Sequence, residues 1–193
     1  MVISETNLVN MAFAKIGAKR INDITADTSV EAIHARIQYE QTRDALLRSF
    51  TWPFATKRVA LSLDTETPAF DYDYQFILPS DYLRLVSTDI DTTETDYLKI
   101  EGKRILVNES TLSIRYVRRV TDPTEFDPLF IEILVLHLAL KFINPLAGTN
   151  MVNVIISIQQ ELNLLTARAR AISKQEQSTS GSSEWNNARL TGV

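Results

Sequence analysis

Apolar residues in this 193-residue chain follow helical spacing in the N-terminal and C-terminal parts and a strand-like alternation between them. Residues 4–16 place apolar side chains three and four positions apart, and Gly17 follows as a helix stop. A second helix is predicted from Thr28 to about Phe50, with Glu31 completing a capping box three residues after Thr28. The chain is therefore predicted to open with two helices.

The second helix carries two apolar stripes, whereas a helix at the edge of a monomer usually needs one. The stripes lie nearly opposite each other, one made of Val30, Ile33, Ile37 and Leu47, the other of Ala32, Ala35, Tyr39, Leu46 and Phe50. This pattern indicates a sandwiched helix. Either both stripes pack against other parts of the same chain, which we favour, or one stripe packs on the chain's own core and the other on another subunit. For the second case the candidate subunit-interface residues are Tyr39, Arg43 and Leu46.

Aromatic residues crowd the point where the helical pattern gives way to a strand pattern. Phe50, Trp52 and Phe54 surround Pro53, which lacks a backbone N–H and disfavours the helical conformation in the residue before it. Aromatic rings bury large apolar areas. We therefore predict a helix-to-strand elbow filled by these rings.

From residue 55 to residue 120 the apolar period changes to two, as in strands with one buried face. The segments with this pattern are 55–63, 72–76, 82–90, 97–101, 104–107 and 111–120. Gly102 and Lys103 form a plausible tight turn between two of them. The pattern predicts a small antiparallel β-domain inserted between helices.

Helical spacing returns after Pro123. Residues 129–143 are apolar nearly all round, so this helix must be enclosed on most sides; we expect it to be too short and too charged to span a membrane. The last helix carries a heptad seam from Met151 to Ile172, with apolar residues at alternating steps of four and three. That seam can pack within a bundle or along a helix of another subunit.

Residues 174–193 are rich in Ser, Gln, Asn and Gly and cannot bury enough apolar surface to fold alone. Trp185, Leu190 and Val193 stand out within this tail. An isolated tryptophan in a polar tail often anchors a partner. The alternative is a loose tail with an incidental tryptophan.

These elements predict an α+β fold: a bundle of about four helices, two N-terminal and two C-terminal, with an inserted antiparallel β-domain and an extended C-terminal tail. The predicted boundaries are 1–53 with 121–173 for the bundle, 54–120 for the β-domain and 174–193 for the tail. Hydrophobic residues make up 45% of the chain and charged residues 23%, which is typical of a globular protein with a real core.

Charge is unevenly distributed along the chain, whose net charge is −4. Residues 61–100 hold nine acidic and two basic residues, a local net charge of −7, whereas residues 101–120 hold five basic and two acidic residues. Duplex DNA is bound through clustered positive charge. An acidic body of this kind fits DNA passing nearby without specific binding, and it equally fits ordinary solubility.

Few residues suggest catalysis or cofactor binding. The chain has no cysteine, which excludes disulfides and thiol chemistry, and its two histidines lack metal-ligand spacing. It contains no phosphate-binding loop, nucleophile elbow or zinc-protease motif. We therefore expect no cofactor, no metal and no enzymatic activity.

Two minor candidates for chemistry stay open. Residues i and i+2 of a strand face the same way, so Asp71 with Asp73, or Asp89 with Asp91, offers a paired carboxylate. His137 lies in the apolar helix; we expect a packed histidine with a hydrogen-bond partner, with a catalytic base as the alternative.

Several motifs, taken in order, resemble one family. They are residues 10–21 (NMAFAKIGAKRI), 43–48 (RDALLR), 52–58 (WPFATKR), 78–84 (LPSDYLR), 116–122 (YVRRVTD) and 126–130 (FDPLF). This order is similar to that of the tail tubular protein A-like head-to-tail adaptors of short-tailed bacteriophages (podoviruses). The resemblance covers roughly residues 5–170, and the polar tail is not matched motif by motif.

The resemblance implies a structural virion protein, made in the host cytoplasm, that is not an enzyme. Members of the family form a homo-oligomeric ring, typically dodecameric, that docks under the portal after DNA packaging. The ring extends the DNA channel and carries the tail nozzle and fibres, with no membrane and no cofactor involved. On this basis Trp185, Arg189 and Leu190 are candidate portal-binding residues, and the elbow joins a portal-facing bundle to a tail-facing β-domain.

Two other functions are weighed against the adaptor. One is a virion-associated cell-wall hydrolase, suggested only by the carboxylates of the β-domain. The other is an assembly or scaffold protein that never enters the virion.

Overall fold

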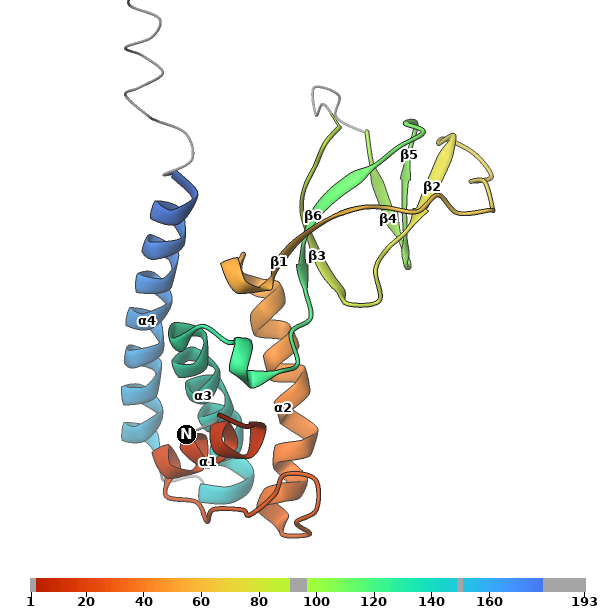
Figure 1. Ribbon diagram of the computed structural model, residues 1–193. Coiled ribbons are helices and arrows are strands. Elements are labelled where there is room, and N and C mark those ends of the chain that lie inside the picture. Colours follow the sequence, from red (N-terminus) through yellow and green to blue (C-terminus); the bar gives the residue numbers. More distant parts are fainter. Residues whose placement is uncertain (1–2, 91–96, 149–150, 179–193) are drawn as a thin grey trace, which may run out of the picture. The chain divides into compact units, whose positions relative to one another are not determined.

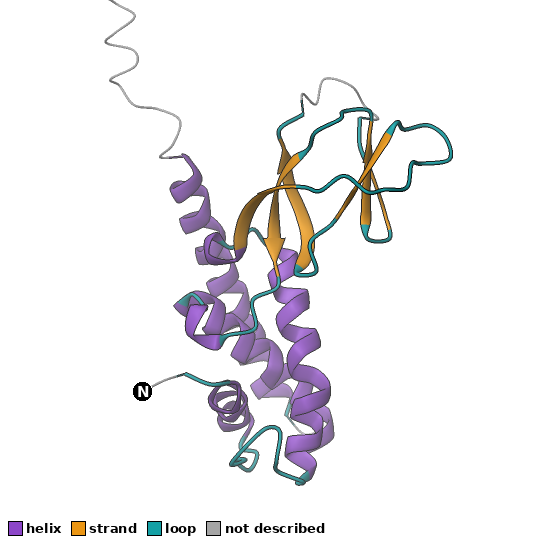
Figure 2. Ribbon diagram, turned by 45° about the vertical axis from the view of Figure 1, so that its right-hand side comes forward, coloured by secondary structure: helices purple, strands orange, loops and turns teal. Residues whose placement is uncertain are grey.

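The computed structural model describes residues 3–90, 97–148 and 151–178 (Figure 1). It contains the helices α1 (Glu5–Ile16), α2 (Val30–Ser49), α3 (Pro128–Phe142) and α4 (Val152–Ser178), with six strands between α2 and α3. The predicted α+β fold class is thereby confirmed. The chain divides into two compact units, a helical unit (Met1–Arg43 with Asp122–Val193) and a β-unit (Asp44–Thr121), and the strands are confined to the second (Figure 2).

Helix α1 begins and ends as its sequence predicts. The hydroxyl of Ser4 accepts a hydrogen bond from the backbone N–H of Asn7 at 3.2 Å, which satisfies one of the free donors of the first turn. Gly17 adopts the left-handed conformation with φ of 70°, and its N–H donates back to the Ala14 carbonyl. A residue with a side chain is strained in that conformation, so Gly17 ends the helix.

Helix α3 forms the centre of the helical unit. Its buried side chains point in nearly every direction; they are Phe130, Ile133, Leu134, Val135, Leu136, Leu138, Ala139 and Phe142. Helices α1 and α4 both pack against it, and the rings of Phe13 and Phe142 lie 4.9 Å apart. The heptad seam of α4 buries Ile158, Leu165 and Ala169. These three seam residues therefore pack within the chain, whereas Ile172, at the end of the seam, is 38% exposed.

The segment Pro128–Ala147 is longer than the sequence indicated. The helical path continues past Phe142 through a π-turn (Ile143–Ala147), giving 20 residues with a mean hydropathy of 1.8. By length and composition this segment is able to cross a membrane, so the expectation that it is too short and too charged is wrong. The buried core helix of a globular protein can have the same length and composition. Helix α3 fits that description, because α1 and α4 pack against it and most of its apolar side chains are buried.

Helix α2 begins one residue later than the capping box predicts. The hydroxyl of Ser29 accepts from the backbone N–H of Ala32 at 3.3 Å, so Ser29 and not Thr28 is the capping residue. Asp27 holds Ser29 in this position, because its carboxylate accepts from the Ser29 N–H at 2.8 Å. The predicted pairing of Thr28 with Glu31 is therefore wrong.

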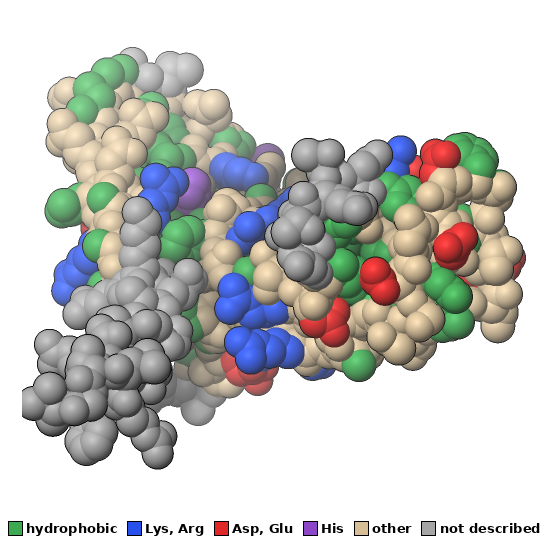
Figure 3. All heavy atoms as spheres, turned by 90° about the horizontal axis from the view of Figure 1, so that it is seen from above, with side chains coloured by type: hydrophobic (Ala, Val, Ile, Leu, Met, Phe, Trp, Pro, Cys, Tyr) green, Lys and Arg blue, Asp and Glu red, His purple; other side chains and the backbone are tan. Residues whose placement is uncertain are grey.

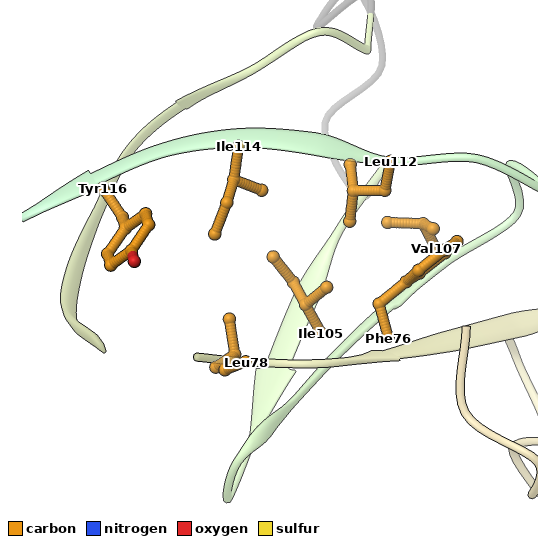
Figure 4. Packing of buried hydrophobic residues seen from close by; sticks show 7 residues of the cluster. All are labelled: Phe76, Leu78, Ile105, Val107, Leu112, Ile114 and Tyr116. Atoms are coloured by element: carbon orange, nitrogen blue, oxygen red, sulfur yellow. The ribbon is translucent and has the colours of Figure 1, made fainter. Parts of the chain in front are cut away.

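The β-unit consists of two three-stranded antiparallel sheets. Sheet A has the order β1 (Thr56–Ala60), β6 (Ser113–Arg118), β3 (Tyr82–Thr88), and sheet B has the order β2 (Tyr74–Ile77), β5 (Arg104–Val107), β4 (Lys99–Glu101). Their inner faces share one core, in which the side chains point toward one another (Figure 4): Phe76, Leu78, Ile105, Val107, Leu112, Ile114 and Tyr116. Gly102, with φ of 58°, makes the predicted turn between β4 and β5.

The β-unit begins within α2, whereas the sequence placed the boundary after Pro53. Arg119, next to β6, donates to the Asp44 carboxylate at 2.7 Å. Arg48 donates to the carbonyl of Leu83 in β3. The last residues of α2 are thus tied to sheet A, and this is why the compact units divide at Asp44.

Candidate functional site

The predicted elbow is a packed corner of the β-unit. Trp52 is only 4% exposed, and its indole N–H donates to the Leu46 carbonyl at 3.2 Å. The ring of Phe50 meets it edge-on at 5.1 Å, and the ring of Phe54 lies 6.1 Å away. Pro53 opens a single 3₁₀ turn (Pro53–Ala55) that leads into β1. The aromatic filling that the sequence predicted is therefore confirmed.

The candidate subunit-interface residues do not form an exposed surface. Tyr39, Arg43 and Leu46 are all buried within the chain. The Arg43 guanidinium lies 5.8 Å from the centre of the Tyr39 ring and 3.8 Å from the Glu5 carboxylate. Burial, assisted by the Glu5 charge, raises the pKa of Tyr39 well above its usual range. The prediction that these residues contact a neighbour is wrong, because their stripe faces the core of their own chain.

The opposite stripe of α2 is the uncovered one. Val30, Ile33 and Ile37 are 60%, 44% and 52% exposed, and their spacing places them on one face of the helix. Leu47, at the end of that stripe, is buried. The favoured expectation of a helix enclosed on both sides by its own chain is therefore wrong for these three residues. We call this surface the α2 stripe (Val30, Ile33, Ile37).

Helix α4 also exposes apolar residues away from its buried seam. Val152, Ile156 and Leu164 are exposed, and none of them belongs to the heptad positions that pack on α3. We call this surface the α4 outer face (Val152, Ile156, Leu164). This face was not predicted, although the apolar residues between the heptad positions were a signal that could have revealed it.

The carboxylate pairs of the β-unit do not have the arrangement that suggested catalysis. Asp71 adopts a left-handed conformation with φ of 68°, so β2 begins only at Tyr74 and neither Asp71 nor Asp73 lies on a strand. Asp89 accepts from the backbone N–H of Ser113 at 2.9 Å, a bond that lowers the pKa of its carboxyl group. Its predicted partner, Asp91, lies outside the described residues. In the described part of the chain, no group of three His, Asp or Glu residues is arranged to hold a metal ion.

His137 is half-buried in α3. Burial, and then the charge of Lys141, lowers the pKa of its imidazole. Within the described residues no hydrogen bond reaches the ring, so the expected partner is not found there. A neutral, partly covered imidazole in this position fits a packing role.

The LPSD motif has a structural role within the β-unit. The Asp81 carboxylate accepts a hydrogen bond from the Tyr116 hydroxyl at 2.9 Å, and the Asp81 carbonyl accepts from the backbone N–H of Arg119 at 2.6 Å. Burial, and then the bond to Asp81, raises the pKa of Tyr116 to about 12. This motif therefore fastens the turn before β3 to the end of β6.

The candidate portal-binding residues Trp185, Arg189 and Leu190 lie outside the described residues, and their role remains a prediction. A scan against protein-family models finds no match, and a search of curated protein sequences finds none either. The adaptor family therefore stands as a resemblance carried by the order of motifs in the sequence.

Proposed function

We propose that this chain is a structural virion protein, a head-to-tail adaptor whose copies form a ring under the portal of a short-tailed phage. In this role the ring extends the DNA channel and joins the capsid to the tail nozzle. The observation that carries the proposal is the α2 stripe, an apolar helix face that stays exposed while the opposite face of the same helix is buried. The order of motifs in the sequence supplies the family.

A ring needs two different surfaces on each copy, one for each neighbour. The helical unit offers two apolar surfaces on different helices, the α2 stripe and the α4 outer face. We assign one to each neighbouring copy in the ring. Tyr39, Arg43 and Leu46 then support α2 from within rather than contact the neighbour.

The size of the apolar surface indicates how assembly is controlled. Burying a Val or Ile side chain completely contributes about 1.5–3 kcal/mol. Because the three residues of the α2 stripe are about half exposed, covering them contributes about 3 kcal/mol. Association of two free proteins costs more than this. We therefore expect rings to form on the portal, which holds the copies side by side.

The hydrolase alternative was based on a pair of carboxylates on one face of a strand. Asp71 and Asp73 instead lie in a loop, so that pair does not form. The scaffold alternative makes a different prediction about particle composition. Mass spectrometry of mature particles separates it from the adaptor, because a scaffold protein is missing from them.

Electron microscopy of the purified protein mixed with portal tests the proposal. We expect rings on the portal for the wild type and for Ser110→Asp, a control at an exposed polar position away from α2. The double variant Ile33→Asp/Ile37→Asp should keep its circular dichroism spectrum and form no ring. Failure of the wild type to form rings on the portal under any condition would refute the adaptor.

A further inference from the structure

Three arginines lie on the outer face of sheet A, the side turned away from the core of the β-unit. Arg58 of β1 pairs directly with Arg115 of β6. Arg84 of β3 pairs with Val117, two residues further along β6. Paired residues share a face of the sheet and successive residues alternate. The three side chains therefore lie opposite the core residue Ile114, and we call this surface the arginine face (Arg58, Arg84, Arg115).

The arginine face has no counter-charge among the described residues. Like charges directly opposite each other on neighbouring strands destabilise a sheet. Other arginines of the β-unit are matched by carboxylates at short distances, in the pairs Arg104–Asp64 at 2.5 Å and Arg119–Asp44 at 2.7 Å. No described carboxylate forms such a pair with any residue of the arginine face.

Two of these arginines are held against the protein. Arg84 donates to the Thr51 hydroxyl at 2.7 Å. The Nε atoms of Arg84 and Arg115 are buried and, within the described residues, have no acceptor. Fixing charged groups in this way is unfavourable unless an opposite charge is nearby. The arginine face is therefore a preorganised site for an anionic group from outside the unit.

The outer face of sheet B carries three carboxylates and two cations around one hollow. The loop from Glu66 to Tyr72 lies over it and encloses a hollow of about 250 Å³. The lining carboxylates are Glu66, Asp71 and Glu101, which we call the acidic face. Two cations also line the hollow. Lys99 pairs with Glu101 at 3.6 Å, and Arg104 pairs with Asp64 and Glu66. Asp71 is therefore the lining carboxylate that has no ion pair among the described residues. Figure 3 shows acidic side chains spread over the β-unit, with Lys and Arg side chains next to some of them.

We propose that the arginine face of one copy binds the acidic face of the next copy. Sheets A and B enclose the core between them (Figure 4), so their outer faces point in opposite directions. Contacts between two different faces on opposite sides of a subunit repeat from copy to copy and generate a ring or a filament. The inference rests on the proposed ring and adds an electrostatic contact between β-units to the apolar contact between helical units.

A second copy fits the arginine face better than nucleic acid does. The β-unit contains twelve acidic and ten basic residues, a net charge of −2. Affinity for nucleic acid grows with the number of phosphates neutralised, and a cluster of three arginines on an acidic unit neutralises few. Arginine also forms two parallel hydrogen bonds with a single carboxylate, so the acidic face supplies groups that match it.

Introduced cysteines test the contact directly, because the chain contains none. Ser87 is exposed and pairs with Arg115 in the sheet, and Thr67 is exposed in the loop of the acidic face. An equimolar mixture of Ser87→Cys and Thr67→Cys chains, mildly oxidised with portal present, should give mixed disulfide dimers. Either chain alone should give few dimers, as should a mixture with Ser110→Cys, an exposed control position.

Charge reversal tests the chemistry of the contact. Arg58→Glu/Arg115→Glu in the Ser87→Cys chain should lower the yield of mixed dimers about tenfold. Glu66→Lys/Glu101→Lys in the Thr67→Cys chain should do the same. Combining the two reversed chains should restore most of the yield, because the charges match again. Salt at about 0.5 M should weaken the wild-type contact, and thermal melts check that each variant is folded.

The outcomes separate this inference from the proposed function. Rings on the portal without mixed dimers would overturn the inference and leave the adaptor standing. Mixed dimers without rings would support the contact and refute the adaptor. If Arg58→Glu/Arg115→Glu abolishes DNA binding but leaves the dimer yield unchanged, the arginine face is a nucleic-acid surface and the inference is overturned.

Discussion

Replacing Trp52 by alanine removes a ring that is 4% exposed and contacts Phe50 and Phe54. Large-to-small changes at buried aromatic residues cost about 3–5 kcal/mol. The change also removes the indole donor to the Leu46 carbonyl. That carbonyl still accepts from the Ser49 hydroxyl at 2.8 Å, so the lost bond adds only about 0.5–1.5 kcal/mol. We expect the free energy of unfolding to fall by about 4 kcal/mol, with part of the loss due to the hydrogen bond.

Urea unfolding followed by far-ultraviolet circular dichroism measures this change. Trp52→Phe keeps a ring but removes the N–H donor, so it should lose only about 1–2 kcal/mol. Phe54→Ala, at a half-buried position of the same corner, should cost less than Trp52→Ala. A loss below about 1 kcal/mol for Trp52→Ala would refute the packing argument. A Trp52→Ala chain that keeps its melting temperature but fails to assemble would instead place Trp52 at a subunit contact.

Three further predictions test separate features. Ser29→Ala should lower stability by about 1 kcal/mol and Thr28→Ala by much less, measured by urea unfolding, because Ser29 caps α2. Burial lowers the pKa of His137 below its ordinary 6.5, so the folded chain binds fewer protons than the unfolded chain. The stability that this neutral imidazole provides is complete above about pH 6.5 and is lost as the pH falls through the lower folded-state pKa. His137→Gln should therefore flatten the dependence of melting temperature on pH below 6.5, and an unchanged slope would contradict this. Trp185→Ala should weaken portal binding in a pull-down while leaving the melting temperature unchanged, and undiminished binding would exclude Trp185 as an anchor.

The elements whose pattern is local were predictable from the sequence. Gly17 ends α1 because only the backbone conformation at that residue is involved, and the aromatic elbow follows from Pro53 and its neighbours. The heptad seam of α4 identified the buried residues Ile158 and Leu165 in the same way. In each case residues close together in the sequence determine the local structure.

Features that depend on distant residues were not predictable. Both stripes of α2 are apolar, and only packing against other helices decides that Tyr39 is buried and Ile33 exposed. The pairing of Arg58 with Arg115 depends on the register between two strands far apart in the chain. The left-handed conformation of Asp71 shortened a strand whose alternation looked complete. For this reason the sequence suggested a paired carboxylate that does not form, and it did not reveal the arginine face.

Strand β4 bears on the solubility of this protein. It is the edge of sheet B, only three residues long, and Lys99 and Glu101 flank its single apolar residue, Ile100. Short edges with charged residues resist the addition of a foreign strand. At high protein concentration, this edge should keep free copies from joining through their backbones into amyloid-like aggregates, so that encounters between copies remain reversible.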